Sequence, residues 1–459
     1  MARSIVPLSL LLVFGGCNFT PKYTRPAAPI PQAWSGGNGA QGGPRAGDLH
    51  WQQYFTNSGM QSVISLALAH NRDLRIAGLN VEKVQAAYSI QRAGLFPTLG
   101  VAASGERYRL PSRMQGGPKT VETDVVSFGV LSWELDFFGR IRSLKEQALN
   151  QFLATEQAKV SAEISLVATV ALQYLTYAAD RQNLKLAQST FETQKSYAEL
   201  INKSYELGIA SELALRQAQS QVESARADVA RFEGLVAMDE NALNLLVGTP
   251  VPADLLPKDL DSVGELADLS AALPSEVLLG RPDILAAEYQ LKAANANIGA
   301  ARAAFFPKIS LTGGVGTMSP ELSTLFASGT GTWSFSPQIS VPIFAGGALR
   351  AGLKVSKVSH EIAVVQYEQA IQSAFREVSD GLVRRAALTS QLEAQHGLLD
   401  ALSAAYRLSE VRYQQGLDAY LSVLVAQQSL YGAQQGMVAT RLARQSNQIT
   451  LYKALGGRL

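Results

Sequence analysis

Two patterns of apolar and polar residues run along this chain, and the longer one has the spacing of an α-helix. Residues 140–207 include neither proline nor glycine, and they are flanked by Gly139 and Gly208. Apolar side chains in the middle of this interval recur every three or four positions, at Ile164, Val167, Ala171, Tyr174 and Ala178. The spacing predicts one continuous helix of roughly 100 Å, at about 1.5 Å per residue. Periodic helices of this length are usually coiled coils or helical repeats.

The second pattern alternates at every residue and predicts β-strands. In the first half, apolar Leu131, Trp133, Leu135 and Phe137 alternate with polar residues; in the second, Trp333, Phe335, Ile339, Val341 and Ile343 do so. Their expected partners are residues 99–103 and 309–315. Such hairpins could pack their apolar face in a soluble protein. Four strands are too few for a transmembrane barrel, which needs about eight, so a membrane interpretation requires three chains to share twelve strands.

The chain repeats itself at a distance of about 208 residues, which indicates a duplicated unit rather than a short-period solenoid. Asp73, Phe96, Gly139 and Tyr205 of the first half correspond to Asp283, Phe306, Gly346 and Tyr413 of the second. Each half is predicted to follow the order helix, two strands, long helix, turn, helix. We expect a first repeat over residues 60–255, a linker over residues 256–282 and a second repeat over residues 283–459. The second long helix is expected over residues 348–415.

The N-terminus has the layout of a secretory signal peptide over residues 1–16, followed by the single cysteine, Cys17. This position resembles a bacterial lipoprotein signal, in which Cys17 becomes the acylated first residue, although Phe14 departs from the usual leucine. Residues 17–59 are rich in proline and glycine, and they are predicted to form an extended, lipid-anchored lead-in.

Composition and motifs narrow the possible functions. The net charge of +2 gives no argument for a nucleic-acid partner. The sequence has no phosphate-binding loop, no nucleophile elbow and no metalloprotease motif, and its four histidines are scattered. We therefore predict no enzyme activity, no cofactor and no metal site.

Several blocks of the sequence resemble the outer-membrane efflux lipoproteins of the TolC superfamily, and most of all the OprM type. The blocks are Cys17 with Pro21, Tyr23, Arg25 and Pro26, and residues 71–74, 133–140, 293–302, 305–307 and 451–457. The resemblance implies an α+β membrane protein: a homotrimer with a 12-stranded outer-membrane β-barrel, four strands per chain, continued by a long periplasmic α-helical barrel. It also implies a lipid anchor in the outer membrane.

The same resemblance implies the function. The protein would be the outer-membrane channel of a tripartite pump, working with a periplasmic membrane-fusion adaptor and an inner-membrane transporter of the resistance-nodulation-division (RND) type. It would conduct drugs or other toxic compounds passively. Two alternatives stay open: a channel for copper or silver ions, because metal-efflux members share many of these blocks, and a periplasmic coiled-coil scaffold without a pore.

Two turns are the candidate sites. Both repeat a tyrosine, a glycine and a leucine at the same spacing, and we expect Gly208 with Leu213, and Gly416 with Leu421, to meet the adaptor. By resemblance, Arg412 and Tyr413 form the gate. Family members carry aspartates beyond the turns, where this chain has Ala214 and Val425. We therefore expect a closed state held by Arg412, Tyr413 and apolar contact from Val425, with Asp418 or Glu212 as possible substitutes.

Overall fold

The computed structural model describes residues 18–31, 34, 49–111, 119–267 and 275–458. The predicted signal peptide and Cys17 lie outside these ranges. The chain divides into two compact units. The strand unit comprises Met1–Ala27, Asn80–Glu156 and Ala286–Tyr367, and the turn unit comprises Ala28–Leu79, Gln157–Leu285 and Glu368–Leu459.

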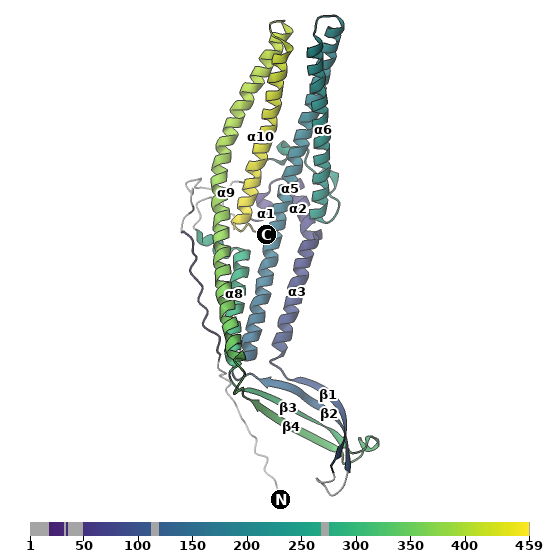
Figure 1. The fold of residues 1–459 in the computed structure, drawn as a ribbon, viewed down its shortest axis with the longest axis vertical. Coiled ribbons are helices and arrows are strands. Elements are labelled where there is room, and N and C mark those ends of the chain that lie inside the picture. The colour runs from purple at the N-terminus through teal and green to yellow at the C-terminus, as the bar shows by residue number, and fades with distance from the viewer. Residues whose placement is uncertain (1–17, 32–33, 35–48, 112–118, 268–274, 459) are drawn as a thin grey trace. The chain divides into compact units, whose positions relative to one another are not determined.

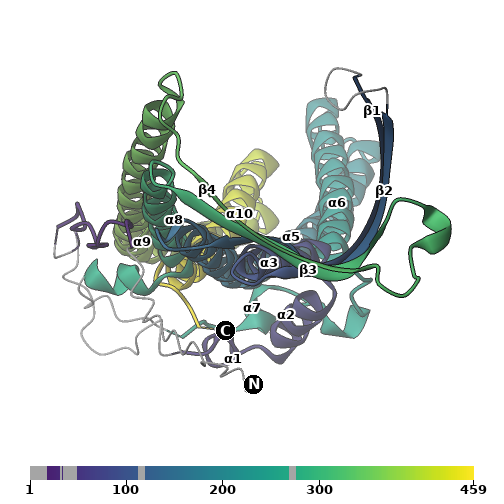
Figure 2. The ribbon, with the colours of Figure 1, turned by 90° about the horizontal axis from the view of Figure 1, so that it is seen from below.

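The strand unit holds one four-stranded antiparallel sheet with the order β1-β2-β3-β4 (Figure 1). Its strands are β1 (Thr98–Leu110), β2 (Lys119–Leu135), β3 (Lys308–Ser319) and β4 (Gly331–Ser340). The short 3-10 helix η4 (Leu322–Thr324) lies between β3 and β4. Figure 2 shows that the sheet is curved. The two hairpins of the two repeats therefore join through the pairing of β2 with β3.

The alternation of apolar residues produces one apolar face of the sheet, as predicted. Val101 pairs with Phe128, Phe128 pairs with Val315, and Val315 pairs with Trp333, so one apolar row crosses all four strands. These four side chains are between 54% and 76% exposed in the single chain. Alternate residues point to the same face, so the pairs of Leu99 with Val130 and of Gly313 with Phe335 extend this face in one direction. An exposed face of this kind requires an apolar environment or a partner.

The strand boundaries differ from the prediction in two places. A register shift between Val130 and Trp133 inserts an extra residue in β2, so the predicted alternation through Leu131 is interrupted. Phe137, and Val341 with Ile343, lie beyond the ends of β2 and β4. Strand β2 has 17 residues, more than the roughly 10 to 13 that the pattern indicated.

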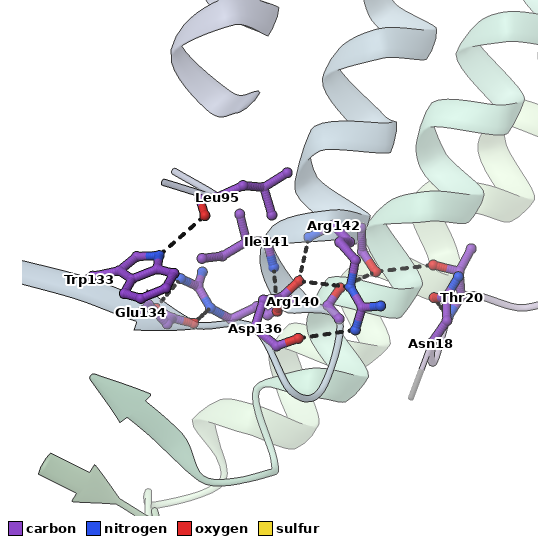
Figure 3. A network of polar contacts seen from close by, with 11 residues as sticks. Asn18, Thr20, Leu95, Trp133, Glu134, Asp136, Arg140, Ile141 and Arg142 are labelled. Carbon is purple, nitrogen blue, oxygen red and sulfur yellow. Dashed lines mark hydrogen bonds and ion pairs between the residues drawn. The ribbon is translucent and has the colours of Figure 1, made fainter. Parts of the chain in front are cut away.

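Both long helices have almost the predicted bounds. Helix α5 (Arg140–Glu206) and helix α9 (Ala348–Gln414) each have 67 residues and contribute to both units. Helix α5 begins immediately after Gly139, which has φ +73°. The Asp136 carboxylate accepts the backbone N–H groups of Ile141 at 3.1 Å and Arg142 at 2.8 Å, which caps the helix (Figure 3). Glycine and a carboxylate thus fix the change from strand to helix.

The remaining helices complete the two repeats. Helices α3 (Arg72–Ala93) and α8 (Pro282–Ala303) precede the hairpins, and α6 (Glu212–Val247) and α10 (Tyr420–Ala454) follow the long helices. The turn unit also holds α1 (Trp51–Tyr54), α2 (Ser58–His70), α7 (Leu260–Val263), η2 (Ala253–Leu255) and η3 (Ser275–Gly280). Tyr54 stacks on Tyr452 at 4.2 Å in its core. Among the helices of the described residues, none combines the length and the apolar character needed to cross a membrane.

Candidate functional site

The two turns that the sequence singles out are built alike within the turn unit. Figure 1 shows one turn between α5 and α6 and the other between α9 and α10. Gly208 and Gly416 both have φ +72°, a backbone conformation that side chains with a Cβ resist. The N–H of Gly416 donates to the carbonyl of Tyr413, and the N–H of Leu417 donates to that of Arg412, both at 2.9 Å. This pair of bonds is the Schellman motif, which ends a helix and satisfies its last carbonyls.

The second turn carries an ion pair that the first turn lacks. Arg412 Nε donates to Asp418 Oδ2 at 2.6 Å, and Arg412 Nη2 donates to Oδ1 at 2.9 Å. The hydrogen bonds raise the pKa of Arg412 and lower the pKa of Asp418. The residues at the equivalent positions of the first turn are Ser204 and Ala210. The bidentate pair therefore braces only the α9–α10 turn.

Aromatic rings pack beneath the second turn. Tyr413 lies 5.5 Å from Tyr420 between ring centroids, and Tyr197 of α5 lies 5.8 Å from Tyr420. Tyr420 is 6% exposed, and burial raises its pKa to about 12. The Tyr197 hydroxyl donates to Glu410 at 2.5 Å. These contacts connect α5 with the start of α10 and the end of α9.

An apolar cluster holds the two helix pairs together at this level. It consists of Ile201, Leu215, Ala218, Tyr420, Val423 and Leu424, and Tyr413 and Ala214 pack against it. Tyr413, expected in the gate, is thus also a packing residue. The sequence argument missed the roles of Tyr197 and Tyr420, although Tyr420 is the first residue of α10 and lies four positions after the glycine of the second turn.

The other predicted site residues lie on the surface of the single chain. Val425 is 55% exposed, and it is not one of the residues that form the apolar cluster around Tyr420. Leu213 and Leu421 are exposed, as are three residues that the sequence argument did not name, Leu207, Ile209 and Leu417. Glu212 pairs with Arg216 at 3.3 Å, so between the two substitutes considered, only Asp418 contacts Arg412.

The turns present apolar side chains and charged pairs at the surface of the single chain. Exposed leucine and isoleucine side chains surround both glycines, and one ion pair closes the second turn. In the part of the chain that the structure describes, no group of three or more His, Cys, Asp or Glu residues is placed to hold a metal ion.

Comparison with known proteins identifies the family. The family profile described as outer membrane efflux protein matches residues 63–249 and again residues 273–457. The chain belongs to the outer membrane efflux protein family. The toluene efflux pump outer membrane protein TtgC of Pseudomonas putida is 45% identical over 468 residues, which cover 100% of this chain and 96% of the relative.

Two further relatives bear on fold and substrate. The cation efflux system protein CusC of Escherichia coli is 40% identical over 464 residues, covering 99% of this chain and 98% of the relative. The crystal structure of the open state of the Neisseria gonorrhoeae MtrE outer membrane channel has a TM-score of 0.86 and 38% identity, and it covers 96% of this chain and 98% of that one.

The family settles several predictions from the sequence. The resemblance to outer-membrane efflux proteins is confirmed, as are the duplicated α+β fold with four strands per chain and the location in the outer membrane. The family decides against a scaffold without a pore. The repeat boundaries, the acylation of Cys17 and the roles of the turn residues stay predictions.

Proposed function

We propose that this efflux-family protein is the outer-membrane channel of a tripartite, RND-type pump, and that it conducts toxic organic compounds passively out of the cell. The observation that carries the proposal is the sheet. One face presents an apolar row from Val101 to Trp333, and the outer edges of β1 and β4 have no partner strand among the described residues. Long open edges are an aggregation hazard unless they pair with another strand.

Three copies of the chain give the apolar face an apolar environment and give both open strand edges a partner. Pairing β4 of one chain with β1 of the next closes a barrel of twelve strands, and closure removes the open edges. The apolar face then meets outer-membrane lipid, while the small and polar residues of the other face, such as Ser127, Ser334 and Ser336, line the bore. The functional unit is therefore a homotrimer.

The other partners follow from the helices. The exposed leucines of the two turns dock a periplasmic membrane-fusion adaptor, which links the channel to the inner-membrane transporter. Acylated Cys17 adds a lipid anchor to the barrel. The protein performs no catalytic step, because energy for export comes from the transporter.

Organic compounds are the favoured substrates. TtgC is a toluene efflux protein and is 45% identical to this chain, while CusC, a cation efflux protein, is 40% identical. The described residues include no metal-binding group of three His, Cys, Asp or Glu side chains, although a passive bore does not need one. Metal-ion efflux is the second candidate.

Deletion of the gene, followed by complementation, tests the proposal. The deletion strain should become sensitive to toluene and to hydrophobic antibiotics, while its tolerance of copper and silver salts stays normal. Purified protein should form ion-conducting pores in planar bilayers. Metal sensitivity without solvent sensitivity would favour the second candidate, and a protein without pore activity would contradict both.

A further inference from the structure

A cavity of about 380 Å³ lies within the turn unit and is here called the α7 cavity. Its walls come from α7 with the loop that follows it, from α9 and from α10. Along α10 it lies about 30 Å from the second turn, counted from Tyr420 to Arg441 at 1.5 Å per residue. Sites that bind small molecules have volumes of roughly 300 to 1,000 Å³. The α7 cavity is therefore large enough for a small ligand and separate from both turns.

The α10 wall of the cavity is basic. Arg441 and Arg444 are three positions apart, so their side chains share one face of the helix. Arg441 Nη1 lies 2.7 Å from Asp261 Oδ1. Arg444 Nη1 lies 3.7 Å from Glu265 Oε1, which is too long for a hydrogen bond. Because a guanidinium has five N–H donors, both arginines keep donors for a further anion.

The wall formed by α7 and its loop is acidic. The side chains of Asp261 and Glu265 are 64% and 84% exposed, so their ion pairs with the arginines contribute little and separate easily. The backbone beneath them is held in place. Thr56 Oγ1 donates to the carbonyl of Glu265 at 3.2 Å, and Asn57 Nδ2 donates to the carbonyl of the intervening Ser262 at 3.1 Å. The two carboxylates can thus turn toward a ligand without movement of the loop.

A buried amide between the two walls lacks one of its partners. Gln445 is 8% exposed, and its Nε2 donates to the carbonyl of Gly264 at 2.9 Å. Its Oε1 is buried and accepts no hydrogen bond from the described residues. Buried acceptors are nearly always paired in folded proteins, because an unpaired one loses its bonds to water without replacement. An N–H group of a ligand bound beside Gln445 is the partner that this oxygen lacks.

The first repeat does not carry this site. The offset of 208 residues between the repeats places Glu233, Val236 and Ala237 of α6 at the positions of the two arginines and Gln445. An acidic, an aliphatic and a methyl side chain provide no donor for a carboxylate. The packing of the duplicated helices therefore does not require the basic wall.

We propose that the α7 cavity binds a short peptide with free termini. Arg441 and Arg444 bind its carboxylate, Asp261 and Glu265 bind its ammonium group, and Gln445 Oε1 accepts its peptide N–H. Because each wall carries two charges of one sign, a ligand with a single charge satisfies one wall and leaves the other without a partner. A single amino acid has the two charges but no peptide N–H between them.

Calorimetric titration of the purified full-length protein tests the proposal without any substitution. The dipeptide alanyl-alanine should bind saturably at neutral pH, with one molecule per chain. N-acetyl-alanyl-alanine has the carboxylate without the ammonium group, and alanyl-alaninamide has the ammonium group without the carboxylate. Each should bind at least roughly tenfold more weakly, because one charged wall loses its charge-assisted hydrogen bonds.

One variant places the carboxylate on the basic wall. Arg444→Gln should weaken the binding of alanyl-alanine roughly tenfold, with an unchanged melting temperature as the check on folding. The matched control is Arg376→Gln, which removes an arginine from an exposed ion pair with Asp380 on α9 and should bind like the wild type.

Three results would overturn the proposal: no saturable binding of alanyl-alanine to the wild type, equal binding of the dipeptide and its two blocked forms, or wild-type affinity in Arg444→Gln. None of these measurements depends on transport, so a negative result leaves the proposed channel function untouched.

Discussion

At the scale of single residues, the second turn shows how a valine in place of the family's aspartate changes the partner of an arginine. Arg412 has no aspartate on the following helix, where Val425 stands instead, and it binds Asp418 of its own turn in a bidentate pair. Such a pair within one chain stiffens the turn and does not by itself join neighbouring chains. We therefore expect the gate of this protein to depend on the shape of the α9–α10 turn, which the pair maintains.

Breaking this ion pair should widen the channel. Arg412→Ala and Asp418→Asn each remove one partner, so both should raise single-channel conductance in planar bilayers by a similar amount, and the double variant should add little. Because the pKa of Asp418 is lowered on folding, its contribution is present above the ordinary pKa of 3.8 and is lost as the pH falls through the folded value. Acid should therefore mimic Asp418→Asn.

The matched control is Arg216→Ala, whose partner Glu212 lies at the first turn. This variant should conduct like the wild type. Wild-type conductance in Arg412→Ala would show that closure is held elsewhere.

A second residue, Asp239 of α6, makes stability depend on pH. Burial and then the neighbouring Asp180 carboxylate raise its pKa from 3.8 to about 6, although Gln173 donates a hydrogen bond to it at 2.9 Å. Since folding raises this pKa, the native state holds the proton more tightly, so stability is fully present below pH 3.8 and is lost as the pH rises from there through about 6.

Asp239→Asn should therefore raise the melting temperature by a few degrees at pH 8 and leave it nearly unchanged at about pH 3.5, below the ordinary pKa, where the carboxyl is protonated in both states. Thermal unfolding followed by circular dichroism at the two pH values measures the difference. Glu240→Gln is the control. It removes the same negative charge from the next residue of the same helix, but the Glu240 side chain is exposed. Equal gains at both pH values would contradict the assignment.

At the scale of elements, the sequence predicts what local chemistry decides. The long helices end within one residue of the predicted positions, because Gly208 and Gly416 take a positive φ that stops a helix. The bulge in β2 was missed, since it depends on pairing with β3, more than 170 positions away. Contacts between residues 18–25 and helix α8, such as Arg302 with Phe19, join residues as far as 283 positions apart and leave no periodic signal. The sequence could not decide between Asp418 and Glu212 as the partner of Arg412, because the direction of each side chain depends on the shape of its turn.

The turns themselves should be required for adaptor docking. Gly208→Val together with Gly416→Val forces a β-branched residue into a left-handed conformation at both turns, at a cost of about 1 to 2 kcal/mol each. Drug resistance should fall while the amount of trimer in the outer membrane stays normal.

The matched control is Gly234→Val with Gly397→Val, on α6 and α9, where an added Cβ meets nothing within 4 Å and φ is helical. Resistance should survive these changes. Unchanged resistance in the turn variant, or equal loss in the control, would count against docking at the turns.

At the scale of the whole molecule, the sheet must both join the two repeats and close around three chains. Every chain contributes one internal seam, β2 with β3, and two outer edges. Glycines line the seam: Gly129 lies opposite Gly314, and Ser127 lies opposite Gly316. They permit the strand backbones to pass closely at the point where the two repeats meet, so we expect assembly of the trimer to depend on this seam inside each chain.

Adding a side chain at this seam should therefore prevent assembly. A Cβ on Gly129 would lie 2.9 Å from the Gly313 carbonyl carbon, and because this obstacle is backbone, β2 and β3 cannot move apart without losing their hydrogen bonds. Gly129→Val should abolish the trimer on semi-native gels while the monomer is still exported and processed. Gly331→Val at the start of β4, where an added Cβ meets nothing within 4 Å, should assemble normally. A Gly129→Val protein that forms trimers and conducts ions like the wild type would show that the seam tolerates a side chain, and that the close approach of β2 and β3 is not what limits barrel closure.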